Sequence, residues 1–254
     1  MKDIIAVINQ KGGVGKSTTA FSLGKAFAVK GFKVLFIDLD SQGNLSYTMN
    51  VQNTNLTSLE LLIGKIKAGK AIQHTKQGDI IAGSPSLAIA DSIILESGKE
   101  YRLKKALAEV TSNYDYIIMD TPPALGILAV NALTACTGAI IPAQADIYSL
   151  QGINQLYKTI SAVQEYSNPD LKVMGILLTR YNPRTVISRD VADMLDKTAK
   201  HFQTKLYKTT IRECTAIKES QIKQTDIFKY APNSNAAVDY KNLAGEIIRD
   251  REEK

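Results

Sequence analysis

One short segment near the start of the chain, NQKGGVGKST at positions 9–18, combines the residue types that hold phosphate groups. Three glycines allow its backbone to pass close to phosphate and to adopt positive φ angles. Lys16 then supplies the cation that such loops place against the β- and γ-phosphates, and the Ser17 hydroxyl is the expected ligand of Mg²⁺. The segment therefore predicts a loop that binds a nucleoside triphosphate together with magnesium.

This segment departs from the general phosphate-loop pattern G-x-x-x-x-G-K-[ST] in two ways. The first glycine of the pattern would fall at position 10, which is Gln10, and a second cation, Lys11, follows directly. A strand-like run at residues 4–9 and a helical stretch at residues 16–30 still flank the loop in the expected order. A glycine turn that arose by chance is therefore a poor explanation of this segment. The presence of the extra lysine requires a separate explanation.

Three aspartates follow apolar runs of strand character. Asp38 and Asp40 come at the end of VLFID and just after it, and Asp120 ends the run YIIMD. The carboxyl ends of parallel strands are where α/β proteins bind ligands. A carboxylate buried there is costly unless a cation compensates it, and Mg²⁺ is the natural partner. One such aspartate alone is more often a helix cap, but three beside a phosphate loop favour a metal and catalytic site.

Strands and helices must alternate along the chain to position these residues. The strand-like runs are apolar on both sides and are separated by helical stretches, which predicts a parallel sheet covered on both faces. The expected fold class is α/β, a P-loop NTPase-type mostly parallel twisted sheet with helices on both faces and one domain over residues 1–254. Residues 41–56 are rich in polar residues and are expected to form a loop. No N-terminal helix-turn-helix domain is expected, because the phosphate loop begins at residue 9.

Composition excludes several classes of function. No apolar run approaches the roughly 20 residues that cross a bilayer, and two histidines make a histidine-based metal cluster an unlikely expectation. The net charge is +6, and residues 197–229 hold eight lysines or arginines against three acidic residues, a net charge of +5. Such a window is typical either of a solvated face or of a surface that binds nucleic acid.

The loop resembles a known family. KGGVGKST is similar to the deviant Walker A motif K-G-G-x-G-K-[ST] of the ParA/MinD class of P-loop ATPases. FIDLDSQGN and YDYIIMDTPP resemble two further segments of that class, with Ser41 where the class has proline. In this class the extra lysine reaches across a dimer interface to the partner's nucleotide. The resemblance therefore implies an ATP-dependent homodimer in which Lys11 offsets charge during phosphoryl transfer.

The resemblance also implies a role for individual residues. Asp40 would polarise the attacking water, Asp38 would support the magnesium shell and Asp120 would hold magnesium through water. Thr18 would touch the α-phosphate, and Asn182 falls where the class often recognises adenine. The expected site residues are: catalytic, Lys11, Lys16 and Asp40; nucleotide-binding, Gly12, Gly13, Val14, Gly15, Lys16, Ser17, Thr18 and Asn182; metal-binding, Ser17, Asp38 and Asp120; DNA-binding, Arg212, Lys218 and Lys223.

Two branches of the class make different predictions for partners. The MinD branch binds membrane through a basic amphipathic C-terminal helix, whereas AGEIIRDREEK at the end of this chain balances acidic and basic residues, so no membrane binding is expected. The partition branch binds DNA without sequence preference, and the basic window lies where small partition ATPases place DNA contacts. The window departs from the class pattern, since Arg212 replaces a proline and ESQI replaces EAPS.

The expected function is an ATP-dependent partition ATPase that dimerises on binding ATP and Mg²⁺, binds double-stranded DNA nonspecifically and is released on hydrolysis. The expected partner is a centromere- or cargo-binding adaptor of the ParB kind that stimulates hydrolysis, and the expected location is the cytoplasm, in association with the nucleoid. The alternative is a MinD-like ATPase that positions protein or membrane-associated cargo without binding DNA. A nucleotide-dependent metabolic enzyme is a third class, for which the sequence offers no substrate pocket.

Overall fold

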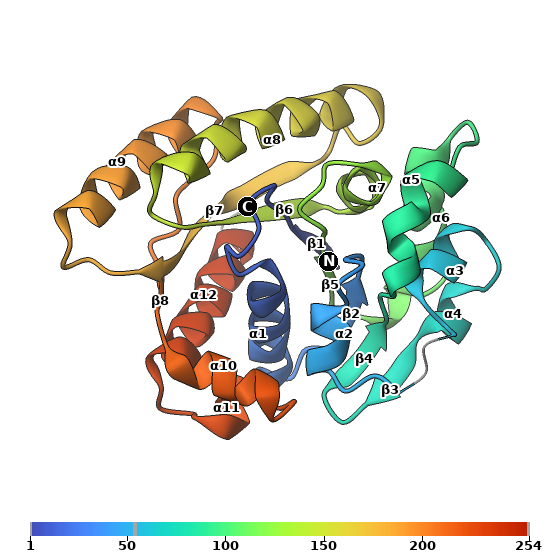
Figure 1. Ribbon diagram of the computed structural model, residues 1–254, viewed down its shortest axis with the longest axis horizontal. Helices are drawn as coiled ribbons and strands as arrows, with labels where there is room; N and C mark the ends of the chain where they lie inside the picture. The colour runs from blue at the N-terminus through green and yellow to red at the C-terminus, as the bar shows by residue number, and fades with distance from the viewer. Residues whose placement is uncertain (1, 53–54, 253–254) are drawn as a thin grey trace.

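The strands form one twisted sheet in the computed structural model, which describes residues 2–52 and 55–252 (Figure 1). Within those ranges the sheet has eight strands in the order β3-β4-β2-β5-β1-β6-β7-β8. Every pairing is parallel except that of β3 with β4. The strands are β1 Asp3–Val7, β2 Val34–Asp38, β3 Gln73–Thr75, β4 Gly78–Ile81, β5 Tyr116–Asp120, β6 Gly138–Ala143, β7 Lys172–Tyr181 and β8 Ile211–Arg212.

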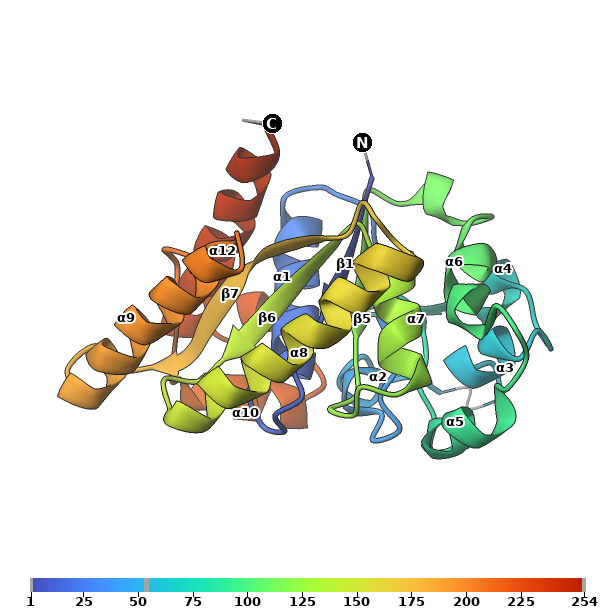
Figure 2. The ribbon, with the colours of Figure 1, turned by 90° about the horizontal axis from the view of Figure 1, so that it is seen from above.

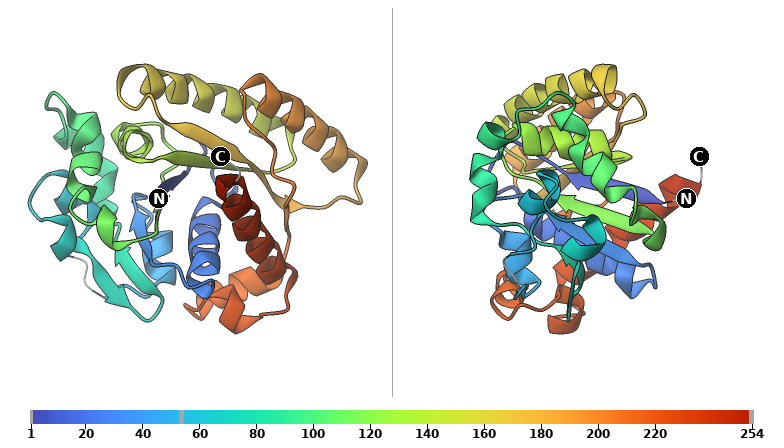
Figure 3. Two further views of the ribbon diagram at one scale, coloured as in Figure 1. Left: turned by 180° about the vertical axis from the view of Figure 1, so that it is seen from behind. Right: turned by 90° about the vertical axis from the view of Figure 1, so that its right-hand side faces the viewer.

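Helices cover both faces of the sheet (Figures 1 and 3). α1, α2, α11 and α12 pack on one face around one apolar core, and α3 to α9 pack around a second core on the other. The predicted α/β fold class is confirmed. The helices are α1 Lys16–Val29, α2 Asn44–Thr48, α3 Ser58–Leu62, α4 Ala68–Ala71, α5 Ala90–Ile93, α6 Arg102–Leu107, α7 Ile127–Ala135, α8 Ile147–Tyr166, α9 Val186–His201, α10 Thr215–Ile222, α11 Ile227–Tyr230 and α12 Asn235–Glu252, with 3₁₀ turns at Pro85–Ile89, Lys99–Tyr101 and Thr111–Asn113.

The strand register brings the chemistry-bearing residues to one edge of the sheet. β5 lies between β1 and β2, and Asp120 pairs in register with Val7 on one side and with Asp38 on the other. β1 leads directly into the phosphate loop, so the loop and both aspartates meet at the carboxyl ends of the central strands. Both chain ends lie at the opposite edge, as the view from above shows (Figure 2).

The expectation of an unbroken loop over residues 41–56 is wrong, because α2 forms within it. Gly43, with φ of 63°, turns the chain into the helix, and its carbonyl accepts a hydrogen bond from the Tyr47 amide at 2.8 Å. Leu45 and Met49, four residues apart, are both fully buried. These two apolar residues lie within a polar stretch of the sequence, yet they are enough to pack one helical turn against the core. None of the described helices is long and apolar enough to span a membrane.

Candidate functional site

The phosphate loop has the backbone geometry that its glycines predicted. Gly13 and Gly15 have φ angles of 76° and 87°, in the left-handed region, and α1 begins immediately after Gly15. A Cβ added at Gly12, Gly13 or Gly15 would have no heavy atom within 4 Å, so the loop faces open space. The carbonyl of Val14 accepts a 2.8 Å hydrogen bond from the Thr179 hydroxyl, which fixes the loop to β7. The exposed amides at the start of α1 can therefore hold an anion.

A cavity of about 560 Å³ lies over this loop. It brings together eight of the predicted site residues and several that the sequence did not single out, from α2, from the end of β7 and from α10. Its lining residues are Gly12, Gly13, Gly15, Lys16, Ser17, Thr18, Asp40, Gln42, Asn44, Tyr47, Thr48, Pro123, Arg180, Lys218, Gln221 and Ile222. Val14, although in the loop, turns away from this cavity and lines a smaller one.

Lys16 is buried, with 7% of its surface exposed, at the base of the large cavity. Its ammonium donates a 3.2 Å hydrogen bond to the Lys11 carbonyl, so the loop holds its own lysine in place. Burial lowers the pKa of Lys16, while the charges of Asp120 and Asp40 act in the opposite direction. The side chain is thus positioned at the loop beside two carboxylates, ready to contact a phosphate group.

Asp120 is fully buried, and neither of its carboxylate oxygens has a partner with hydrogen-bond geometry among the described residues. Burial, followed by the charge of Asp38, raises the pKa of Asp120 well above its usual range. The Ser17 hydroxyl and Lys16 are close enough to oppose this rise without cancelling it. A carboxylate with two buried, unpaired oxygens next to a serine hydroxyl fits the outer shell of a bound magnesium ion.

Asp38 is equally buried but fully hydrogen-bonded. One oxygen accepts bonds from the amide and hydroxyl of Ser46 at 2.9 and 2.6 Å, and the other accepts from the Asp40 amide at 3.1 Å. Burial raises the pKa of Asp38 to about 6, although these hydrogen bonds act against the rise. The predicted support of the magnesium shell by Asp38 stays a prediction, while its oxygens hold the start of α2 and the chain at Asp40 in this structure.

Asp40 lines the large cavity with 6% of its surface exposed. One of its oxygens accepts a hydrogen bond from the Gln42 amide at 3.0 Å, which holds the carboxylate at the cavity wall. No group of three or more acidic, histidine or cysteine side chains suited to a metal occurs within residues 2–52 and 55–252. Protein ligands alone do not complete a metal site here, as expected where phosphate and water supply most of the magnesium shell.

The two lysines of the loop have different surroundings. Lys11 does not line the large cavity, and its ammonium forms an ion pair with Asp146, the N-cap of α8. Its amide donates to the Asn9 side chain at 3.0 Å, and Asn9 is anchored on the Pro142 carbonyl at 2.7 Å. Burial alone would raise the pKa of Asp146, but hydrogen bonds from Lys11 and Ser149 lower it. The extra lysine is thus held outside its own nucleotide cavity.

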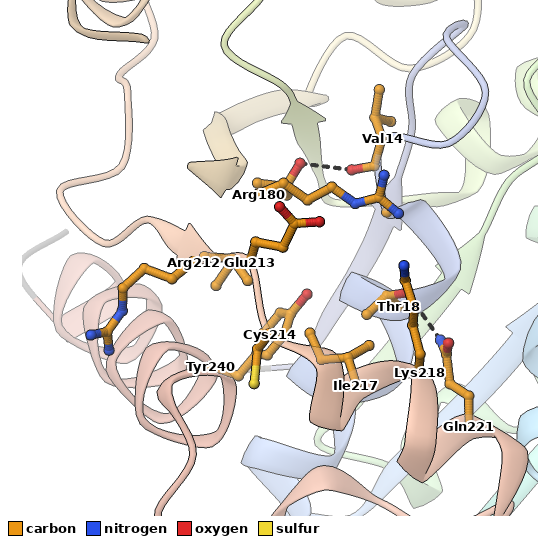
Figure 4. Close-up of a pocket in the computed structure, with 13 residues that line it drawn as sticks. Val14, Thr18, Arg180, Arg212, Glu213, Cys214, Ile217, Lys218, Gln221 and Tyr240 are labelled. Atoms are coloured by element: carbon orange, nitrogen blue, oxygen red, sulfur yellow. Dashed lines mark hydrogen bonds between the residues drawn. The ribbon is translucent and has the colours of Figure 1, made fainter. Parts of the chain in front are cut away.

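A smaller cavity of about 80 Å³ lies beside the large one, between the loop, the end of β7 and α10 (Figure 4). Its apolar wall comes from Ile211, Cys214, Ile217 and Tyr240. Asn182, the predicted adenine contact, is exposed and lines neither cavity, and its side-chain oxygen accepts from the Arg184 amide at 3.1 Å. Its predicted role stays a prediction, while Arg180, which the sequence did not single out, lines both cavities.

The fold pairs two cations of the basic window, Lys205 and Arg212, with acidic residues of α12. Arg212 binds the carboxylate of Asp239 on α12 through both its Nε and a terminal nitrogen, at 2.6 to 3.2 Å. The ammonium of Lys205 lies between two carboxylates of the same helix, those of Glu246 and Asp250. The net charge of +5 counted along the chain therefore overstates the free positive charge of this surface. Of the three predicted DNA contacts, Lys218 lines both cavities and Lys223 is exposed at the end of α10.

Comparisons with known proteins agree on one family. Residues 2–173 match the AAA domain family. The chain is 38% identical to the sporulation initiation inhibitor protein Soj of Bacillus subtilis, over 97% of this chain and 98% of Soj. It is 36% identical to the chromosome partitioning protein ParA of Caulobacter vibrioides, over 99% of this chain and 97% of ParA.

A solved structure with similar coverage is a cobyrinic acid a,c-diamide synthase from Mycobacterium smegmatis with bound ADP and magnesium. It superposes with a TM-score of 0.85 at 34% identity and covers 99% of this chain and 96% of that one. A parallel sheet, a glycine loop before α1 and a carboxylate at the end of β5 define a P-loop ATPase. The chain belongs to the AAA domain family that includes the Soj and ParA partitioning proteins, as the resemblance of its loop predicted.

Proposed function

We propose that this chain is a partition ATPase that dimerises when it binds ATP, binds DNA without sequence preference and leaves DNA after hydrolysis. The observation that carries the proposal is the difference between the two loop lysines. Lys16 is buried at the base of the nucleotide cavity, whereas Lys11 lies outside it and pairs with Asp146. A loop lysine that cannot serve its own nucleotide is placed to serve a second one. The names of the Soj and ParA relatives support the same function.

ATP and magnesium are the proposed cofactors. The amides after Gly12 would cradle the β- and γ-phosphates, with Lys16 as their cation and the Ser17 hydroxyl and Asp120 on the side of the metal. When it is bound, the metal would neutralise part of the negative charge of the phosphates. The unpaired oxygens of Asp120 are the feature of this structure that fits such a group.

Hydrolysis requires a water aligned with the terminal phosphate. Asp40 lies at the cavity wall, held by the Gln42 amide, and would accept a hydrogen bond from that water. Asp38 would keep Asp40 in place through the bond from the Asp40 amide. Lys11 of one subunit would exchange Asp146 for the phosphates of the other subunit, where its charge offsets that of the transition state.

The DNA surface is proposed to centre on the end of α10 and on α11. Lys223 and Lys229 are exposed there, and Lys241 of α12 lies over the Phe228 ring of α11 at 5.7 Å. Lysines placed in this way contact phosphates rather than bases, so binding would be salt-dependent and tolerant of sequence. Lys223 is retained as a DNA contact, whereas Arg212 is held by Asp239 in this structure. An adaptor protein that stimulates hydrolysis and a cytoplasmic location on the nucleoid complete the proposal.

The test compares Lys11→Ala with Lys65→Ala, which removes an exposed lysine that lines neither cavity. We expect Lys11→Ala to keep its affinity for Mg·ADP, to remain monomeric with ATP and to lose hydrolysis by at least about 100-fold, in the range of lost transition-state cations. Light scattering during size-exclusion chromatography measures the dimer. Normal hydrolysis by a monomer would overturn the proposal.

A second arm separates DNA from membrane as the surface that the dimer binds. The unmodified chain is sedimented with plain duplex DNA and with anionic liposomes, each with and without ATP. Binding to DNA only with ATP, with an affinity that falls steeply as salt rises, is the expected result. Binding to liposomes instead would favour the cargo-positioning alternative without DNA.

A further inference from the structure

The large and the small cavity meet in a neck beside the first turn of α1. The residues that line both cavities are Gly15, Thr18, Arg180, Lys218 and Gln221. A nucleotide with its terminal phosphates at Lys16 and its base against the apolar wall of the small cavity passes through this neck. The part of the nucleotide at the neck is then the α-phosphate and the ribose.

Arg180 reaches the neck from an irregular point of β7. Thr179 pairs with Ile211 of β8 and Tyr181 pairs with Arg212, so Arg180 is the extra residue of a β-bulge. Its φ angle is +50°, a left-handed conformation that arginine adopts rarely. Bulges and such backbone angles recur next to binding sites because they re-aim a side chain. Here they direct the guanidinium group into the neck.

Lys218 reaches the same space from α10 on the opposite wall. Figure 4 shows its side chain extending past Thr18 toward the guanidinium of Arg180. A hydrogen bond of 3.1 Å from Gln221 to the Thr18 hydroxyl holds α10 against the first turn of α1. The position of Lys218 over the neck is therefore fixed by the helix that carries it.

The two cations at the neck have no ion-pair partner among the described residues. Neither Arg180 nor Lys218 forms an ion pair with any residue in the ranges 2–52 and 55–252, and this includes Glu213, the carboxylate of the small cavity. Like charges brought together by the fold repel each other unless an anion lies between them. An anion between the two exposed cations would relieve this repulsion, and a phosphate group of the nucleotide is the anion that reaches the neck.

We propose that Arg180 and Lys218 form a two-cation clamp on the α-phosphate of the bound nucleotide. The clamp supplements the phosphate loop, which holds the terminal phosphates, and recognises any nucleoside 5′-phosphate. It rests on nucleotide binding and is independent of the proposed DNA binding. It also gives Lys218 a role in the nucleotide site, in place of the DNA contact that the charge pattern predicted.

The test is calorimetry of Arg180→Ala and Lys218→Ala with Mg·ADP, AMP and adenosine. Each variant should bind Mg·ADP and AMP about tenfold more weakly, the loss typical of one charge-assisted contact to phosphate, and should bind adenosine as the unmodified chain does. The matched controls are Arg184→Ala, three residues past β7, and Lys208→Ala, just before β8; both are exposed and outside the cavities. Neither control should change any affinity.

The thermal midpoint without nucleotide separates this effect from damage to the fold. Removing one of two repelling charges should leave the midpoint unchanged or raise it. Two results would overturn the clamp: an unchanged affinity of both variants for AMP, or an equal loss of affinity for adenosine. Unchanged nucleotide affinity with weaker DNA binding by Lys218→Ala would return Lys218 to the DNA surface.

Discussion

Asp38 and Asp120 stand side by side in neighbouring strands, in register and both fully buried, yet their surroundings differ. Asp38 accepts three hydrogen bonds from protein groups, whereas Asp120 accepts none with good geometry from the described residues. A buried carboxylate whose oxygens accept hydrogen bonds from the protein orients the chain around it. A buried carboxylate whose oxygens have no such partners is suited to bind a ligand. The comparison shows that two residues of the same type, at equivalent strand ends, can divide structure and binding between them.

The largest expected effect is that of Asp120→Asn. The neutral side chain removes the charge that fits magnesium, so we expect Mg²⁺-dependent ATP affinity to fall by about 100-fold, the upper end for lost metal-site partners. The same change removes an unpaired buried charge, so the unfolding free energy without nucleotide should rise by about 1–3 kcal/mol. Calorimetry with and without Mg²⁺ and urea unfolding measure the two effects. An unchanged response to Mg²⁺ would show that Asp120 is structural, as Asp38 is.

The pH dependence of stability is the next largest effect. The pKa of Asp38 is raised to about 6, and burial raises that of Asp120 as well. Because the folded chain binds these protons more tightly than the unfolded chain, stability falls as pH rises from the unfolded value near 4 through the raised pKa. For Asp38 alone this amounts to about 3 kcal/mol.

Urea unfolding of the unmodified chain and of Asp120→Asn over pH 5 to 8 measures that dependence. The stabilising effect of Asp120→Asn should shrink as the pH falls, because protonation neutralises the native carboxyl as well. A constant difference between the two proteins across this range would contradict the raised pKa of Asp120.

A smaller effect is expected from Gly83→Ala, which disturbs the surroundings of Asp38, the carboxylate that accepts hydrogen bonds from the protein. An added Cβ would lie 2.9 Å from the Asp38 carboxyl carbon and 2.9 Å from the Asp40 carbonyl oxygen. Overpacking of this kind costs about 1–3 kcal/mol, and it should slow hydrolysis through Asp40 more than it weakens Mg·ADP binding. The control is Gly69→Ala in α4, where no atom lies within 4 Å of the added Cβ. Equal thermal midpoints of the two variants would show that the Asp38 pocket is not tightly packed.

The sequence predicts those parts of the site whose position is determined by residues close together in the chain. The glycine loop, Lys16 and the strand-end aspartates are recognisable because the pattern that positions each one is only a few residues long. Asp146, the partner of Lys11, lies 135 residues further along the chain, and only the fold brings the two together. The charge counted along the basic window overstates its free positive charge for the same reason. Asp239 lies outside the window and reaches Arg212 through the packing of α12.

Arg180 shows a second limit of sequence reading. Its place at the neck depends on a bulge of β7 against β8, a strand of two residues that has no signal of its own. The α2 turn was missed because one buried apolar pair within a polar stretch is too short to show a helical period.

The ion pair that holds Lys11 has a consequence for the proposed dimer, because it must break before Lys11 can reach a second subunit. Its side chains are 29% and 32% exposed, and pairs in contact with solvent contribute no more than about 1 kcal/mol. A symmetric dimer would release two such pairs, and since 1.4 kcal/mol equals a factor of ten in an equilibrium constant, their loss would raise the protein concentration needed for half-dimerisation by no more than about 30-fold. Asp146 would therefore hold the lysine outside its own cavity at a small cost, and the occupancy of the nucleotide site would decide when the proposed dimer accumulates.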